Sequence, residues 1–161
     1  MNAPTPALDL APALVVLPGA RAAVADGGGE ARDLRPPYAR ELIEHGPVLV
    51  VHAAMTARRL GLNVPPRSRG IFDALELFAF VRPARFTAPS AAGLAIAVGL
   101  DEPKGAAAQA ESLRAVCSLL LDELATEPWP SREEALALAE TLERAGWAWG
   151  VACIAALRSG P

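Results

Sequence analysis

The sequence contains few of the residue types on which most catalytic and metal sites depend. Only two histidines and two cysteines occur among its 161 residues, and Cys117 and Cys153 form no CxxC pattern. Widely spaced cysteines of this kind are typical of small buried or half-buried thiols in a reducing compartment. The histidines and cysteines together have no zinc spacing. The sequence therefore predicts no metal site of the zinc-finger type and no disulfide framework.

The short motifs that mark common enzyme classes are absent as well. The sequence has no Gly-x-Ser-x-Gly elbow of a hydrolase and no Walker motif. The three glycines at 27–29 follow Asp26 and lack the Lys-Ser/Thr that holds phosphates and magnesium, so they predict a hairpin turn. We therefore do not expect this chain to hydrolyse ATP through a phosphate-binding loop.

Long apolar runs are also missing. No run reaches the ~20 residues needed to span a bilayer, and the N-terminus lacks a basic region followed by an apolar core. We expect a cytoplasmic protein with no membrane partner. The net charge of −3 does not favour a strong polyanion binder, although arginines cluster in the middle of the chain.

The sequence is rich in apolar residues, which make up 52% of the chain. The densest apolar run is 71–83, where large side chains from Phe72 to Phe78 recur at helical spacing and Asp73 can cap or start the helix. A second helix is predicted over 90–99, between a serine N-cap and a glycine C-cap. A segment as apolar as 71–83 has to be buried, so other elements must cover it.

The order of the remaining predicted elements indicates an α/β fold, because a β-meander is followed by a buried strand that leads directly into a helix. The expected elements are strands at 13–17, 21–25, 30–34 and 48–51 and helices at 38–44, 53–60, 106–126, 131–145 and 151–157. The helix at 131–145 opens on a capping box, Ser131-Arg-Glu-Glu134. We divide the chain into a flexible N-terminus (1–11), an α/β domain (12–126) and C-terminal helices (127–161).

Several groups of side chains are candidates for binding or chemistry, and each has a structural alternative. The arginines of the middle region could contact phosphates or form a solvated face; they are Arg58, Arg59, Arg67, Arg69, Arg82 and Arg85. Asp73 and Glu76 could bind a metal or act as an acid and base, or they could cap a helix and face solvent. His52 follows a buried strand, where active-site residues are often found, but can equally be structural.

The tryptophans are open to two interpretations. Trp129, Trp147 and Trp149 lie in the C-terminal region, and tryptophan is favoured at protein interfaces. Trp147 and Trp149 could anchor a partner, or they could be ordinary core residues.

Taken in order, residues 48–125 resemble a DEDD-type 3′–5′ exonuclease domain, which has a ribonuclease H-like α/β fold. The resemblance rests on a strand leading into His52-Ala-Ala-Met-Thr-Ala57, on Phe72-Asp-Ala-Leu-Glu-Leu-Phe-Ala-Phe-Val-Arg-Pro83, on Ser90-Ala-Ala-Gly-Leu-Ala-Ile-Ala-Val-Gly-Leu100 and on Lys104-Gly-Ala-Ala-Ala-Gln-Ala110. The implied fold is a ribonuclease H-like mixed sheet flanked by helices, with extra C-terminal helices.

The departures from this family concern its chemistry, which needs four acidic residues that hold two magnesium or manganese ions and a base that activates water. No acidic residue occurs over 10–24, where the first motif would lie. The other acidic positions fall on Ala57 and Gln109, an asparagine position falls on Ala53, and the base falls on Lys104. The resemblance therefore implies a dead nuclease without catalytic residues, cofactor or metal.

A second resemblance is to the N-terminal region of some bacterial DinG-type ATP-dependent DNA helicases. It rests on the segment Leu75-Glu-Leu-Phe-Ala-Phe-Val-Arg-Pro-Ala-Arg-Phe86 and on the Pro-Ser-x-x-Gly-Leu-Ala helix that follows it. This resemblance implies a non-catalytic module that is seen apart from its motor domain, and it suggests a role in DNA repair. DNA and the helicase motor domain are the candidate partners, and the oligomeric state stays open.

Three functions follow from the sequence. The first is a non-catalytic accessory module that positions DNA or docks on a helicase core. The second is a metal-dependent nuclease with relocated ligands, for instance Asp73, Glu76 and Asp101. The third is a purely structural interaction domain whose C-terminal helices bind a partner.

Overall fold

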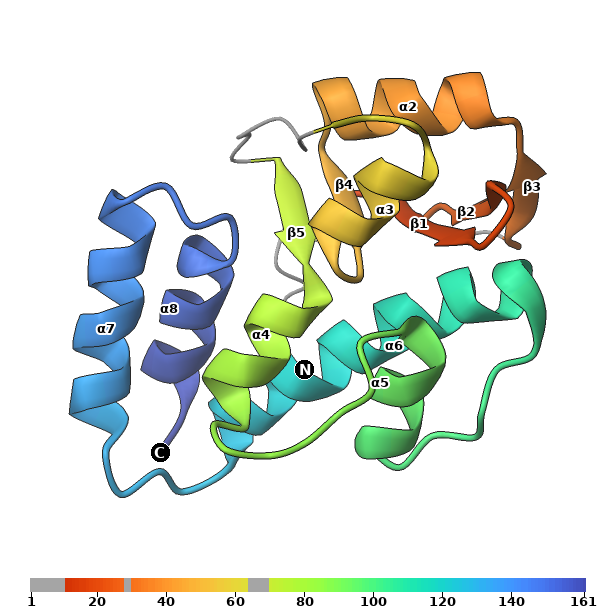
Figure 1. Cartoon of the computed structure of the whole chain (residues 1–161). Helices are drawn as coiled ribbons and strands as arrows, with labels where there is room; N and C mark the ends of the chain where they lie inside the picture. The colour runs from red at the N-terminus through yellow and green to blue at the C-terminus, as the bar shows by residue number, and fades with distance from the viewer. Residues whose placement is uncertain (1–10, 28–29, 64–69) are drawn as a thin grey trace.

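A five-stranded mixed β-sheet is the base of the fold in the computed structural model, which describes residues 11–27, 30–63 and 70–161 (Figure 1). The strands are β1 (Ala13–Leu17), β2 (Arg21–Ala25), β3 (Arg32–Leu34), β4 (Val48–Val50) and β5 (Ile71–Asp73). Their order across the sheet is β3-β2-β1-β4-β5. β1 and β2 are antiparallel, as are β2 and β3, whereas β1–β4 and β4–β5 are parallel. β2 is therefore antiparallel to the other four strands of this sheet.

Both faces of the sheet are covered, because alternate residues of the central strand enter different clusters of buried side chains. Leu14 and Val16 of β1 pack with α2 (Pro36–His45) and α3 (Ala53–Arg59) in the smaller cluster. Val15 packs in the larger cluster with the long helix α6 (Gly105–Thr126). Figure 1 shows α2 and α3 on one side of the sheet and α6 on the other.

Helix α6 is the centre of the larger cluster. Its buried stripe recurs at helical spacing and consists of Ala110, Leu113, Val116, Cys117, Leu120, Leu121, Leu124 and Ala125. This stripe covers β1 and β2 and also contacts α4 (Ala74–Val81) and α5 (Ala91–Ala97). The sequence predicted this helix and its apolar face, and both are confirmed.

The C-terminal pair, α7 (Arg132–Arg144) and α8 (Gly150–Ser159), shares the same large core. The guanidinium of Arg132 donates hydrogen bonds to the carbonyls of Leu124 (3.1 Å), Glu127 (2.7 Å) and Leu157 (2.7 Å). This side chain therefore ties the end of α6 to the end of α8. The division of the sequence at 126–127 falls between helices that have one core in common. None of the described helices is long and apolar enough to cross a membrane.

The general α/β fold and most elements agree with the sequence prediction, including the β-meander and the fully buried β4. One difference is in the central stretch, where residues Ile71–Asp73 form a strand beside β4 and the helix begins only at Ala74. A second difference is at α7, where Ser131 is the N-cap residue but its side chain makes no capping hydrogen bond. The capping box is therefore not formed.

Candidate functional site

The adjacent ends of β4 and β5 meet at one carboxylate. Asp73 closes β5, is only 9% exposed, and caps α4 by accepting a hydrogen bond from the backbone N–H of Leu75 (3.0 Å). Its two oxygens also accept hydrogen bonds from the N–H groups of His52 (2.9 Å) and Ala53 (2.7 Å), at the start of α3. A carboxylate is well suited to two helix N-termini because their free N–H groups carry partial positive charge. Asp73 therefore joins α3 and α4.

His52 is the turn residue between β4 and α3. Its backbone is left-handed (φ 57°), a conformation that few residues other than glycine adopt. Its Nδ1 accepts a hydrogen bond from the N–H of Met55 at 3.2 Å, so in the neutral ring the proton is on Nε2. His52 is thus the cap of α3, which is the structural alternative that the sequence left open.

Glu76, in the first turn of α4, is a carboxyl group whose pKa is raised above its ordinary value. Burial raises the pKa of Glu76, the hydrogen bond from the indole N–H of Trp147 (3.0 Å) lowers it, and the negative charge of Asp73 raises it further. The Trp147 ring also packs against Phe80, with ring centroids 5.2 Å apart. Glu76 therefore links α4 to the segment before α8.

Trp149 belongs to the core. It has no exposed area, its indole N–H donates to the backbone carbonyl of Asp73 at 2.8 Å, and its ring meets that of Phe72 edge-on at 5.1 Å. A side chain without exposed area has no surface to offer a partner. Of the two interpretations of the tryptophans, Trp149 therefore follows the core one, whereas Trp147 is only partly buried.

The positions that the exonuclease resemblance assigns to metal ligands do not assemble a metal site. β1 carries only apolar residues. Ala57 is fully buried in the smaller cluster, on the side of α2 and α3, whereas Gln109 lies in α6 on the other face of the sheet. Lys104 is the exposed N-cap residue of α6 and pairs with Glu102 (2.7 Å).

The three relocated ligands do not form one site either, although Asp73 lies close enough to Glu76 for its charge to act on that carboxyl group. Asp73 already accepts three backbone hydrogen bonds, Glu76 accepts one from Trp147, and Asp101 is exposed in the connection between α5 and α6. Within 11–27, 30–63 and 70–161, no group of three or more histidine, cysteine, aspartate or glutamate side chains could hold a metal ion.

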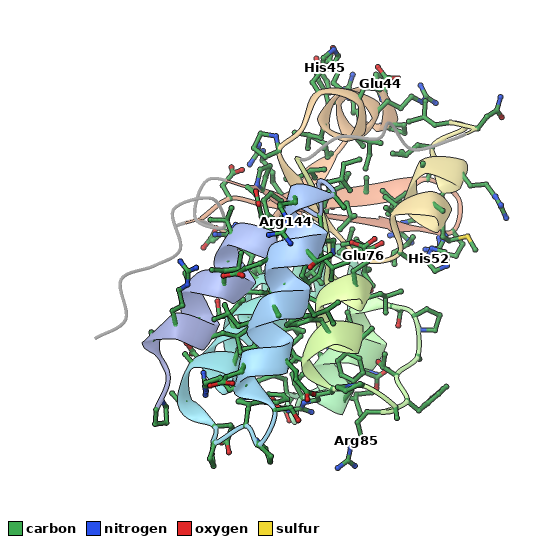
Figure 2. All side chains as sticks on the ribbon, turned by 90° about the vertical axis from the view of Figure 1, so that its left-hand side faces the viewer. Glu44, His45, His52, Glu76, Arg85 and Arg144 are labelled. Carbon is green, nitrogen blue, oxygen red and sulfur yellow. The ribbon has the colours of Figure 1, made fainter. Side chains whose placement is uncertain are left out.

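The arginines do not form one phosphate-facing patch among the described residues. Arg67 and Arg69 lie outside those residues. The guanidinium of Arg59 donates to the carbonyl of Val16 at 2.7 Å, and that of Arg82 is engaged by an ion pair described below. Arg58 and Arg85 are exposed, but the first is in α3 and the second follows α4. Figure 2 shows Arg85 pointing into solvent well away from His52, where α3 begins.

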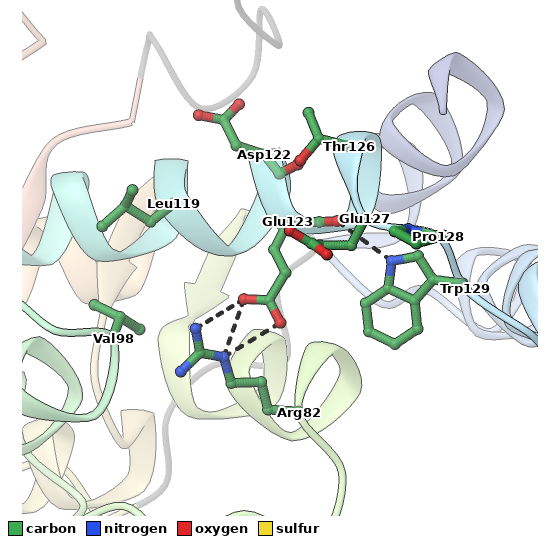
Figure 3. A pocket seen from close by; sticks show the side chains of 9 residues that line it. All are labelled: Arg82, Val98, Leu119, Asp122, Glu123, Thr126, Glu127, Pro128 and Trp129. Atoms are coloured by element: carbon green, nitrogen blue, oxygen red, sulfur yellow. Dashed lines mark hydrogen bonds and ion pairs between the residues drawn. The ribbon is translucent and has the colours of Figure 1, made fainter. Parts of the chain in front are cut away.

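An open groove is the feature that the sequence analysis missed. It has a volume of about 620 Å³ and lies between the end of α4, the end of α5 and the last turns of α6 (Figure 3). Its lining residues are Arg82, Val98, Leu119, Asp122, Glu123, Thr126, Glu127, Pro128 and Trp129. The Trp129-Pro130 pair indicates the end of a helix, but nothing in the sequence shows that Arg82 faces the end of α6.

An ion pair forms one wall of this groove. Arg82 Nη2 lies 2.8 Å from Glu123 Oε2, Arg82 Nε donates to the same carboxylate, and Nη1 donates to the carbonyl of Ala97 at 2.8 Å. Both side chains are about three-quarters buried. The pair therefore fixes α4 and α5 against α6, and it leaves little of the Arg82 charge for a ligand.

Comparisons of the chain with known protein families, with curated proteins and with solved structures found no match.

Proposed function

We propose that this chain is a non-catalytic, ribonuclease H-like accessory module that works by docking, within a DNA helicase-type protein. The arrangement of the β-sheet is the main support for this proposal. Its order is β3-β2-β1-β4-β5, with β2 antiparallel to its neighbours, and this mixed sheet with helices on both faces supports the kind of fold that the resemblance implies. A meander that passes into parallel strands with helices on both faces also fits the exonuclease resemblance of the sequence.

We propose no nuclease function because of the residues at the positions that the resemblance assigns to metal ligands. Two-metal hydrolysis needs carboxylates that clamp both ions. The positions that resemble the family's ligands hold apolar β1 residues, Ala57 and Gln109. The nearby Asp73 accepts three hydrogen bonds from the N-termini of α3 and α4. These groups support a scaffold role for the strand ends.

Docking is supported over DNA positioning by the distribution of charge. The net charge is −3, and the four described candidate arginines are divided between structural bonds and separate parts of the surface. Phosphate binding depends on several cations acting together. We therefore place the module on a protein surface, the helicase motor domain being the partner implied by the DinG resemblance.

The experiment combines calorimetric titration with manganese and incubation with a labelled DNA single strand. The expected result is no heat of binding and no strand shortening, because no described group can hold the ions. Saturable manganese binding together with shortening of the strand would overturn the proposal in favour of a nuclease with relocated ligands.

A second measurement separates docking from DNA positioning. Fluorescence anisotropy with the same strand is recorded at low and physiological salt, for the chain and for an Arg58→Ala, Arg85→Ala variant. We expect weak binding that the variant does not change. Tight binding that falls steeply with salt and with these substitutions would favour DNA positioning.

A further inference from the structure

The open groove at the end of α6 has the composition of a site for a basic protein segment. Its apolar surface comes from Val98, Leu119 and Trp129, of which Leu119 is 41% exposed. Its polar surface is mainly acidic, from Asp122, Glu123 and Glu127. Since Arg82 neutralises Glu123, two carboxylates remain for a ligand.

These two carboxylates, Asp122 and Glu127, are exposed and take part in none of the ion pairs found among the described residues. Asp122 lies near the end of α6 and Glu127 is the C-cap residue of this helix, and in Figure 3 the Asp122 side chain extends away from Trp129. An acidic rim above an apolar floor repels phosphate and attracts a cationic side chain.

Trp129 adds an aromatic surface to this rim. Its indole N–H donates to the carbonyl of Glu123 at 3.3 Å, which fixes the ring beside the groove. The preceding segment is held as well, because Arg132 donates to the carbonyl of Glu127. A fixed indole is the preferred partner of an arginine or lysine cation, and a preformed site lowers the entropic cost of binding.

We propose that this groove binds a basic segment of a partner protein, with one arginine or lysine of the segment against Trp129 and near Glu127 and a second near Asp122. An aliphatic neighbour of these cations would lie on Leu119 and Val98. This inference rests on the proposed docking function, and it specifies the chemistry of the partner segment that docks. The groove itself does not depend on the ribonuclease H-like identity of the fold.

The test is a titration of the isotope-labelled chain, followed by NMR. The probe is a short peptide of alternating arginine and leucine, and the matched probe has glutamate in place of arginine. We expect the arginine peptide to shift the indole N–H signal of Trp129 and the methyl signals of Leu119, and the glutamate peptide to leave both unchanged.

Charge variants make the test specific. Asp122→Asn with Glu127→Gln should weaken binding of the arginine peptide by about threefold to tenfold, since each removes one exposed ion pair. Glu41→Gln with Glu44→Gln on α2 makes the same change in net charge away from the groove and should leave the affinity unchanged.

Several results would overturn the inference. These are no shift with the arginine peptide, equal weakening by the two double variants, or displacement of the peptide by single-stranded DNA that shifts the same signals. None of them bears on manganese binding or strand shortening, so the failure of this site and the failure of the non-catalytic assignment can be told apart.

Discussion

Replacing Asp73 by alanine tests whether this carboxylate is a structural junction. The change removes the cap of α4, which costs about 1 kcal/mol. It also removes two hydrogen bonds from the start of α3 to a charged acceptor, at about 1.5–3 kcal/mol each. Because these bonds share one carboxylate, their costs are not fully additive, and we expect a loss of about 4 kcal/mol in the free energy of unfolding.

The assay is urea unfolding followed by circular dichroism, with Asp101→Ala as the control. Asp101 is also an aspartate, but it is exposed and has no hydrogen bond among the described residues, so its loss should change stability by less than about 0.5 kcal/mol. Asp73→Asn gives a second reading, since asparagine is also a good N-cap but lacks the charge; we expect a smaller loss.

The reasoning would be refuted if Asp73→Ala were as stable as the control variant. A metal-ligand role predicts a different pattern, in which manganese stabilises the original chain but not the variant, by mass action on the folded state. The junction role predicts no effect of manganese on either protein.

Three further predictions concern Trp149, Glu76 and the two cysteines. Trp149→Ala should cost about 3–5 kcal/mol or prevent folding, whereas Trp149→Phe should keep most of the packing and lose the hydrogen bond to Asp73; thermal unfolding compares the two. Because the folded state raises the pKa of Glu76 above its ordinary value of 4.5, the stability of the original chain relative to Glu76→Gln should fall as the pH rises above 4.5; urea unfolding of both proteins at acidic and neutral pH measures this difference. Burial raises the pKa of Cys117 and raises that of Cys153 to about 12, so both thiols should react with a chromogenic disulfide reagent only after denaturation.

Local sequence patterns predicted the elements whose signals lie within a few residues. The apolar run of β4 is such a case, because four consecutive apolar residues between a Gly-Pro turn and a helix suit a strand with neighbours on both sides. The helix after Ser90 is another, since Ser90 accepts a hydrogen bond from the N–H of Gly93 as a cap should.

Contacts between distant segments decided the remainder. Phe72 lies at helical spacing from Phe78, yet it belongs to a strand because its backbone pairs with Leu49 of β4. No local pattern contains this pairing. Likewise, the side chain of Ser131 makes no capping hydrogen bond, and the neighbouring Arg132 bonds to carbonyls at the ends of α6 and α8, contacts that no local pattern contains.

The candidate site was the least predictable part of the molecule. The hydrogen bond from Trp147 to Glu76 joins segments 71 positions apart, and no local pattern contains it. The groove needs Arg82 and Glu123 to meet across 41 positions of sequence, and neither residue is distinctive in its own segment. The strand ends, which the exonuclease resemblance marks as the site of chemistry, carry residues that cap helices and pack in the core.

The two outer strands of the sheet restrict how this protein can associate. β3 and β5 have three residues each; β3 exposes Arg32 and Asp33, and β5 stops at the carboxylate of Asp73. A short edge with exposed charges is a poor template for a further strand, so extension of the sheet at β3, and the fibrous aggregation that it starts, are disfavoured. Specific recognition is thereby left to the helical surface.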